Sequence, residues 1–139
     1  MSIERVGVIG AGQMGSGIAE VSAKAGADVI VYEPTDELVT AGHKRLTQSL
    51  ERAAAKGKLS EDDRDAALGR LKFTTDLADL ADRQLVIEAV VEDETVKGKI
   101  FAELDKVITD PDVVLASNTS SIPIMKIAAA TQNPSRVLG

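Results

Sequence analysis

Three glycines near the start of the chain have the spacing of a turn that binds phosphate groups. The six residues GAGQMG, at positions 10–15, follow the short apolar run 6–9 and precede a helical pattern. At such a strand-to-helix turn the first glycine allows the tight bend, the second lets a diphosphate reach the main chain, and the third lets helix and strand pack closely. The N–H groups at the start of the helix then face the anion. The predicted phosphate-binding residues are Gly10, Ala11, Gly12, Gln13, Met14 and Gly15.

An acidic residue follows this turn at the distance expected for a dinucleotide site. Glu33 stands 21 residues after Gly12 and directly after the second apolar run, DVIVY at 28–32. A carboxylate at the end of that strand accepts hydrogen bonds from the adenosine ribose. It also repels a 2′-phosphate, and because no arginine adjoins it, the sequence favours NAD over NADP. The alternative, that the glycines serve only turn and packing and Glu33 is a solvated strand end, is disfavoured because strand, glycines, helix, second strand and acid fall in register.

Alternating strands and helices must position these residues. Short apolar runs bounded by turn residues predict strands, and apolar residues at helical spacing predict helices between them. The predicted strands are 6–9, 28–32, 71–74, 85–90, 113–116 and 136–138. The predicted helices run from the glycine turn to a stop at Gly26, then over 35–56, 60–71, 76–81 and 94–109, with a last one from about 123. Buried strands separated by helices indicate an α/β fold of one domain, 1–139, with a doubly wound parallel sheet.

Two of these helices show the apolar stripe of a buried face. The long helix 35–56 is followed by helix 60–71, which Ser60 opens as an N-cap with Asp63 in its first turn. The two helices predict a long helical hairpin inserted after the second strand. The expected stripe of the long helix is Leu38, Gly42, Leu46, Leu50 and Ala53. That of helix 94–109 is Val96, Ile100, Leu104 and Val107.

The composition restricts the classes of ligand. The chain has 139 residues and a formal net charge of −6, with one tyrosine, two phenylalanines and no tryptophan. It therefore lacks the basic field and the stacking aromatics of a nucleic-acid-binding protein. No apolar run approaches the length of a membrane span, and the N-terminus indicates a first strand rather than a signal peptide. The absence of cysteine removes thiolate metal sites and fits a reducing compartment, so we expect a cytoplasmic protein with a small ligand and no metal, nucleic-acid or membrane partner.

Three stretches together resemble a known enzyme family. They are VIGAGQMG at 8–15, IEAVVE at 87–92 followed by Lys97 and Phe101, and ASNTSS at 116–121. In these stretches the chain is similar, over essentially its whole length, to the N-terminal NAD-binding domain of the 3-hydroxyacyl-CoA dehydrogenases, including the short-chain 3-hydroxybutyryl-CoA enzymes. The resemblance implies a Rossmann-type fold, NAD as cofactor and an acyl-CoA substrate. It also implies oxidation of (S)-3-hydroxyacyl-CoA to 3-oxoacyl-CoA by hydride transfer to NAD, in fatty-acid beta-oxidation or butanoate metabolism.

The resemblance assigns three residues to the reacting end of the site. It places Glu92 and Lys97 by the nicotinamide half of NAD, and it makes Ser120 the active-site serine near the substrate 3-oxygen and the cofactor. Independently, Glu92 and Lys97 follow a predicted strand at the edge where ligands of open α/β sheets collect. Without the resemblance, the pair would be ordinary exposed charges, and Ser120 would belong to a polar loop that caps the helix near Pro123. Both roles can coexist, with Ser121 at the cap.

The long helix matches the part of the family that contacts the coenzyme A tail. Ser49, Arg52 and Lys56 are spaced i, i+3, i+7 and share one face, away from the leucine stripe. Residues 43–58 carry five cations against one anion, a local charge of +4 that attracts phosphates. We expect Ser49 and Lys56, with Ser120, to contact the CoA substrate; the alternative for this cationic stretch is a solvated face. The five cations are Lys44, Arg45, Arg52, Lys56 and Lys58.

The resemblance also implies parts that these 139 residues do not carry. In the family a histidine paired with a glutamate takes the hydroxyl proton, and a helical second domain closes the acyl pocket and forms a homodimer. His43 is the only histidine here, and its place early in the long helix gives it no catalytic role. We therefore expect 1–139 to be the NAD-binding domain of a longer enzyme, with little or no turnover alone. A non-catalytic NAD-binding or structural relative, as lens crystallins illustrate, and a dehydrogenase of a different hydroxy acid are the alternatives.

Overall fold

The chain folds around a parallel sheet. The computed structural model describes residues 3–119, 122 and 124–139. Within these residues six strands lie in the order β3-β2-β1-β4-β5-β6, and every neighbouring pair is parallel, which confirms the predicted doubly wound α/β fold. The strands are β1 (Arg5–Ile9), β2 (Asp28–Tyr32), β3 (Leu71–Thr74), β4 (Leu85–Glu88), β5 (Val114–Ser117) and β6 (Val137–Leu138). The helices are α1 (Gln13–Lys24), α2 (Asp36–Ala55), α3 (Glu61–Arg70), α4 (Glu94–Val107) and α5 (Ile124–Ala128), with the 3-10 turns η1 (Leu77–Leu80) and η2 (Pro134–Arg136).

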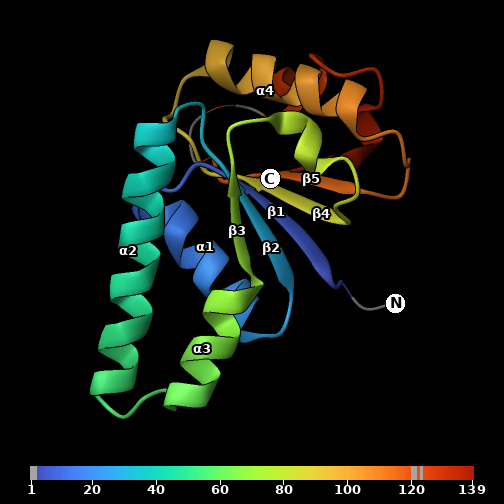
Figure 1. Ribbon diagram of the computed structural model, residues 1–139. Coiled ribbons are helices and arrows are strands. Elements are labelled where there is room, and N and C mark those ends of the chain that lie inside the picture. Colours follow the sequence, from blue (N-terminus) through green and yellow to red (C-terminus); the bar gives the residue numbers. More distant parts are fainter. Residues whose placement is uncertain (1–2, 120–121, 123) are drawn as a thin grey trace.

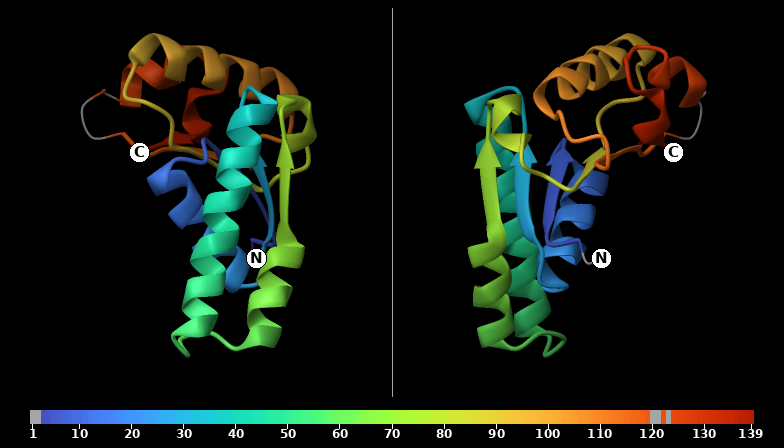
Figure 2. Two further views of the ribbon diagram at one scale, coloured as in Figure 1. Left: turned by 60° about the vertical axis from the view of Figure 1, so that its left-hand side comes forward. Right: turned by 90° about the vertical axis from the view of Figure 1, so that its right-hand side faces the viewer.

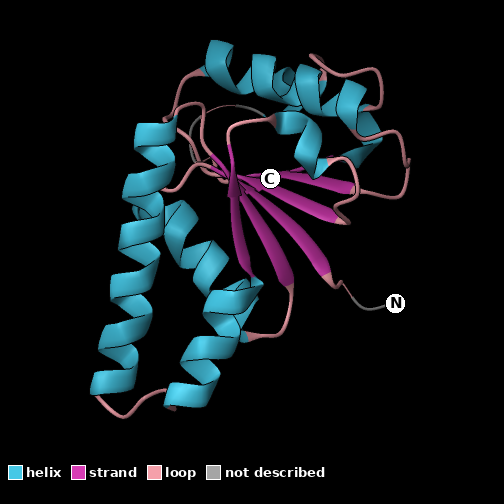
Figure 3. Cartoon of the chain, viewed as in Figure 1, coloured by secondary structure: helices cyan, strands magenta, loops and turns pink. Residues whose placement is uncertain are grey.

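Alternate side chains of the central strand β1 belong to two separate cores. Val8 is buried in a core that includes Leu46 of α2, whereas its neighbour Ile9 is buried in a core that includes Phe101 of α4. Because successive side chains of a strand point to opposite faces, these two cores are the two faces of the sheet. Figure 3 shows the twisted sheet with α1, α2 and α3 to one side and α4 above it. The sheet is therefore covered on both faces, as expected for parallel strands.

The helices α2 and α3 form the predicted hairpin, and their connecting turn lies at the end farthest from α4 (Figures 1 and 2). The Thr35 side chain accepts a hydrogen bond from the Leu38 N–H and begins α2. The Ser60 hydroxyl accepts from the Asp63 N–H at 3.0 Å and begins α3, as predicted. Among the described residues, no helix combines the length and apolar character needed to cross a lipid bilayer.

The buried faces of α2 and α4 differ from the predicted stripes near the start of each helix. Leu38 is 44% exposed and Val96 is 39% exposed, although the helical period placed both in a core. Both instead line a cleft at the carboxyl ends of the strands. In α4 the fully buried positions are Lys97, Phe101 and Leu104, so the face turned inward begins one residue later than predicted.

Two strands are shorter than predicted because backbone N–H groups at their ends bond outside the sheet. Strand β4 ends at Glu88 rather than at Val90, and the Val90 N–H donates to the Glu88 carboxylate at 2.7 Å. Strand β6 begins at Val137 rather than at Arg136, because the Arg136 N–H donates to the Asn133 carbonyl oxygen in the turn η2. The buried Arg136 guanidinium instead binds the Asp105 carboxylate at 2.8 Å. It thereby ties η2 to the end of α4.

Candidate functional site

The glycine turn between β1 and α1 has the geometry that its glycines predict. Gly10 has φ +99°, and a Cβ there would lie 2.7 Å from the Ala89 carbonyl oxygen. A Cβ on Gly15 would overlap the Gly10 carbonyl oxygen, so α1 packs on the turn only because this position has no side chain. At Gly12, by contrast, a Cβ would meet no protein atom within 4 Å. Gly10 and Gly15 thus shape the turn, as predicted, while Gly12 leaves an open surface.

The start of α1 is suited to an anion. Gly12 is the N-cap residue of α1 and supplies no side-chain cap, so no hydroxyl or carboxylate of its own competes for the N–H groups of the first turn. Such N–H groups, at the positive end of the helix dipole, bind phosphate. The Ala11 N–H donates to Glu33 Oε2 at 3.0 Å, which places the predicted acid beside the turn.

A cleft of about 540 Å³ opens in front of the turn, between the ends of β1, β2 and β4. The order of the sheet reverses between β1 and β4, and open α/β sheets bind ligands at such a point. Gly10, Gly12 and Glu33 line the cleft together with apolar walls. Burial, with the charge of Glu33 adding to it, raises the pKa of the phenol of Tyr32, which lines the cleft. The apolar walls include Pro34, Leu38, Val90, Val96 and Ile100.

A fully buried ion pair lies beneath the ends of β4 and β5. The Lys97 ammonium lies 2.8 and 3.0 Å from the two Glu88 carboxylate oxygens, and both side chains have no exposed surface. The Ser117 hydroxyl donates to Glu88 Oε1 at 2.6 Å, and the Val90 N–H donates to Oε2. Because every partner of Glu88 is a donor, this carboxylate is held in one orientation.

The structure brings the predicted residues Glu92 and Lys97 together. Glu92 Oε1 lies 3.3 Å from the Lys97 ammonium and accepts a hydrogen bond from the Thr119 hydroxyl at 2.7 Å. The Lys97 ammonium is therefore inside the protein rather than in an exposed pair. Ser120 and Ser121 lie outside the described residues. Their neighbour Thr119 places the beginning of that loop beside Glu92.

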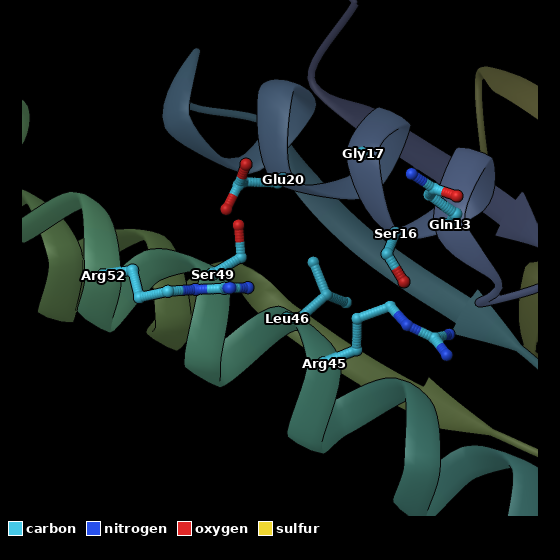
Figure 4. A pocket seen from close by; sticks show the side chains of 8 residues that line it. All are labelled: Gln13, Ser16, Gly17, Glu20, Arg45, Leu46, Ser49 and Arg52. Carbon is cyan, nitrogen blue, oxygen red and sulfur yellow. The ribbon is translucent and has the colours of Figure 1, made fainter.

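The face of α2 that carries Ser49 and Lys56 is hollowed. A hollow of about 460 Å³ between α1 and α2 is lined by Ser49 together with Arg45 and Arg52 (Figure 4). An adjoining hollow of about 220 Å³ is lined by Ser49, Arg52 and Lys56. Gln13 of the glycine turn lines the first hollow, so the turn and the cationic face of α2 adjoin each other.

His43 lies away from these groups, on the exposed side of α2. Its ring packs edge-on against Phe73 of β3, with the ring centroids 5.1 Å apart. His43 is not among the described residues that line the cleft. Within the described part of the chain, no cluster of histidine, aspartate and glutamate side chains is placed to hold a metal ion.

Two positions with structural roles at the site were not predicted. Glu88 had a detectable signal, since it is the one charged residue in the apolar run 85–90. Arg45 had none, because it stands among other cations on a helix. Its Nη1 donates to the Ala11 carbonyl oxygen in the glycine turn. Only the packing of α2 on the turn identifies it.

The comparisons with known proteins identify the family of the chain. The model of the 3-hydroxyacyl-CoA dehydrogenase NAD binding domain matches residues 5–139. The 3-hydroxybutyryl-CoA dehydrogenase of Mycobacterium tuberculosis strain H37Rv is 72% identical over 138 residues, which are 99% of this chain and 48% of the relative. This chain spans about half the length of the curated 3-hydroxybutyryl-CoA dehydrogenases that it matches.

Two crystal structures of related proteins show the same fold. That of M. tuberculosis FadB2 has a TM-score of 0.97 at 71% identity, over 99% of this chain and 48% of that one. That of the (S)-3-hydroxybutyryl-CoA dehydrogenase PaaH1 from Ralstonia eutropha has a TM-score of 0.92 at 41% identity, over 98% of this chain and 48% of that one. From its glycine turn, its sheet order and these matches, the chain belongs to the family of 3-hydroxyacyl-CoA dehydrogenase NAD-binding domains.

Proposed function

We propose that the chain is the NAD-binding part of an oxidoreductase that converts (S)-3-hydroxyacyl-CoA, of short chain such as 3-hydroxybutyryl-CoA, to 3-oxoacyl-CoA. The observation that carries the proposal is the glycine turn, with the Glu33 carboxylate on the Ala11 amide and an apolar cleft in front of it. When bound, NAD supplies the acceptor for the hydride from C3 of the substrate. The names of the most similar relatives support the choice of substrate.

In this proposal different residues of the chain bind different parts of the dinucleotide. The turn, from Gly10 to Gly15, seats the diphosphate against main-chain amides. Glu33 accepts a hydrogen bond from a ribose hydroxyl while its Oε2 continues to accept one from the Ala11 N–H. Glu92 and Lys97 lie towards the nicotinamide half, and the buried Glu88 holds the Lys97 ammonium in place. Ser120, three residues beyond the end of β5 in the sequence, holds the substrate 3-oxygen.

The CoA tail is proposed to bind along α2. Ser49 and Lys56 line adjoining hollows on one face of that helix, in a stretch with a local positive charge. Phosphate groups are attracted to such a face, and the serine hydroxyl can donate to them. The anionic ends of both ligands would then lie on the two sides of the glycine turn.

The residues 1–139 are proposed to bind NAD without turning over substrate on their own. His43, the single histidine of this sequence, packs on Phe73, and loss of a general base costs about 10²- to 10⁴-fold in rate. We infer that the base and a helical domain that forms the acyl pocket and a homodimer belong to a longer protein. The lack of cysteine supports a cytoplasmic location. Wild-type-level reduction of acetoacetyl-CoA by NADH with these residues alone would contradict this proposal.

An alanine at Gly12 tests the placement of the diphosphate. The apo fold is expected to tolerate Gly12→Ala, because the new Cβ meets no protein atom within 4 Å. In the complex that Cβ occupies the surface on which the diphosphate rests, so we expect the Kd for NADH to rise at least about tenfold. Isothermal titration calorimetry measures this change, and Gly17→Ala, also in open space, is the control. Equal NADH affinities for both variants would place the diphosphate elsewhere.

Substitutions of Glu33 test the preference for NAD over NADP. Glu33→Gln keeps an oxygen that accepts from the Ala11 N–H and removes the charge that repels a 2′-phosphate. We expect the ratio of the Kd for NADPH to that for NADH to fall about tenfold in Glu33→Gln, because one repulsion at close range is lost. Glu33→Ala, which also removes the acceptor, should weaken the binding of both. The proposed ribose contact is wrong if Glu33→Gln leaves the ratio unchanged.

A further inference from the structure

Both polar groups of Ala11, in the middle of the glycine turn, are held by side chains from outside the turn. Its N–H donates to Glu33 Oε2 at 3.0 Å. Its carbonyl oxygen accepts from Arg45 Nη1 at 2.5 Å and from the Ser16 hydroxyl at 2.8 Å. The Ala11 residue itself is only 1% exposed. Two successive peptide groups of the turn are therefore held by side chains of other elements.

The Arg45 side chain reaches the turn because α2 lies against it. Gly42, one helical turn before Arg45, makes the close approach, since a Cβ on Gly42 would overlap the Ala11 Cβ. Residues three apart on a helix share a face, so Gly42 and Arg45 meet the turn together. The contact of α2 with the glycine turn thus consists of one steric fit and one charged hydrogen bond.

The carbonyl that Arg45 holds belongs to the same peptide group as the Gly12 N–H. The described peptide bonds are all trans, and in a trans peptide the carbonyl oxygen and the N–H point in opposite directions. With the oxygen turned to Arg45 and Ser16, the Gly12 N–H is directed away from these two side chains. Gly12 also lines the cleft.

We propose that Arg45 is a positioning residue for dinucleotide binding: its guanidinium holds the Ala11 carbonyl and so directs the Gly12 N–H towards the diphosphate. The inference rests on the proposed placement of the diphosphate at this turn. Arg45 has no contact with the ligand in this arrangement and acts through the backbone. A charged donor holds a carbonyl more firmly than a neutral one, which suits this task.

The test compares Arg45→Met with Arg52→Met, using NADH and adenosine as ligands. Arg52 lies two helical turns further along α2 and lines the same hollow, so both variants remove one guanidinium charge from it. We expect Arg45→Met to raise the Kd for NADH about tenfold and Arg52→Met to change it less than about twofold. Calorimetry measures NADH, and NMR titration measures adenosine, which has no phosphate. The Kd for adenosine should be unchanged in both, and the Gly12 amide resonance should shift only in Arg45→Met.

Two further variants keep the inference testable if Arg45→Met does not fold. Arg45→Lys retains a charged donor and should recover part of the NADH affinity. Ser16→Ala removes the other donor to the same carbonyl and should weaken NADH binding about two- to threefold. Wild-type NADH affinity in both Arg45→Lys and Ser16→Ala would overturn the inference. Equal effects of Arg45→Met and Arg52→Met on the Kd for NADH would also overturn it, as would a loss of adenosine affinity in Arg45→Met as large as its loss of NADH affinity. If Gly12→Ala binds NADH normally, the placement of the diphosphate is at fault instead.

Discussion

Alanine at Gly15 is expected to abolish measurable NADH binding and to destabilise the apo domain, although alanine is the better helix former. A Cβ on Gly15 would overlap the Gly10 carbonyl oxygen. Relief requires α1 to move away from the turn or the Gly10 peptide to rotate, and either change displaces the amides that are proposed to bind the diphosphate. Such overpacking costs about 1–3 kcal/mol. The gain from replacing glycine within a helix is about 1 kcal/mol, so the steric cost exceeds it on average.

Gly17→Ala separates this steric effect from helix propensity. Gly17 lies two residues further along α1, and a Cβ there meets nothing within 4 Å. The same substitution should therefore stabilise the domain by about 0.5–1 kcal/mol and leave the Kd for NADH unchanged. Thermal unfolding of the apo proteins and calorimetry with NADH measure the two effects. If Gly15→Ala is more stable than the wild type and binds NADH normally, α1 does not pack on the turn as described.

Local sequence patterns were sufficient to predict an element where residues such as proline, glycine or a capping hydroxyl mark its ends. Strand β2 has the bounds 28–32 that its apolar run predicts, since Glu33 and Pro34 end it. The caps Thr35 and Ser60 begin their helices because a hydroxyl at that position accepts an N–H bond within the next few residues. The glycine turn belongs to the same class. The positive φ of Gly10 and the contact of Gly15 with the Gly10 carbonyl oxygen both lie within one strand, one turn and one helix, whereas the close approach of Ala89 to Gly10 comes from the segment after β4.

Periodicity could not distinguish a side chain in the core from one in a ligand cleft. Leu38 and Val96 are apolar at helical spacing, yet they line the cleft, because ligand clefts are lined by the same apolar residue types as a core. Pairings between distant elements were equally hidden. Glu88 meets Lys97 only when α4 packs on β4, and Arg45 meets Ala11 only when α2 packs on the turn. No spacing within one element encodes either contact.

Removing the Lys97 ammonium is expected to be among the most destabilising changes in the chain. Glu88 would keep the Ser117 hydroxyl and the Val90 N–H as donors but would lose its counter-charge while having no exposed surface. Breaking a buried pair in this way costs about 3–5 kcal/mol. Domains of this size have about 5–15 kcal/mol of stability, so Lys97→Met should lower the free energy of unfolding by a large fraction. Urea denaturation at neutral pH measures it.

The double variant Glu88→Gln/Lys97→Met shows whether the loss of stability in Lys97→Met comes from the unpaired buried charge of Glu88. A glutamine at position 88 keeps an oxygen for the Val90 N–H, its NH2 group can donate to the Ser117 hydroxyl, and it carries no charge, so the double variant should be more stable than Lys97→Met alone. The losses of stability in Glu88→Gln and in Lys97→Met should not simply add in the double variant, because coupling between contacting buried charges exceeds about 0.5 kcal/mol. Additive losses would mean that water reaches the pair. The double variant could also recover stability, with a positive coupling energy, and still bind NADH more weakly than the wild type. This result would separate the role of the pair in stability from its role in NADH binding. The pair would then be needed to position Glu92 at the nicotinamide end rather than to hold the domain together.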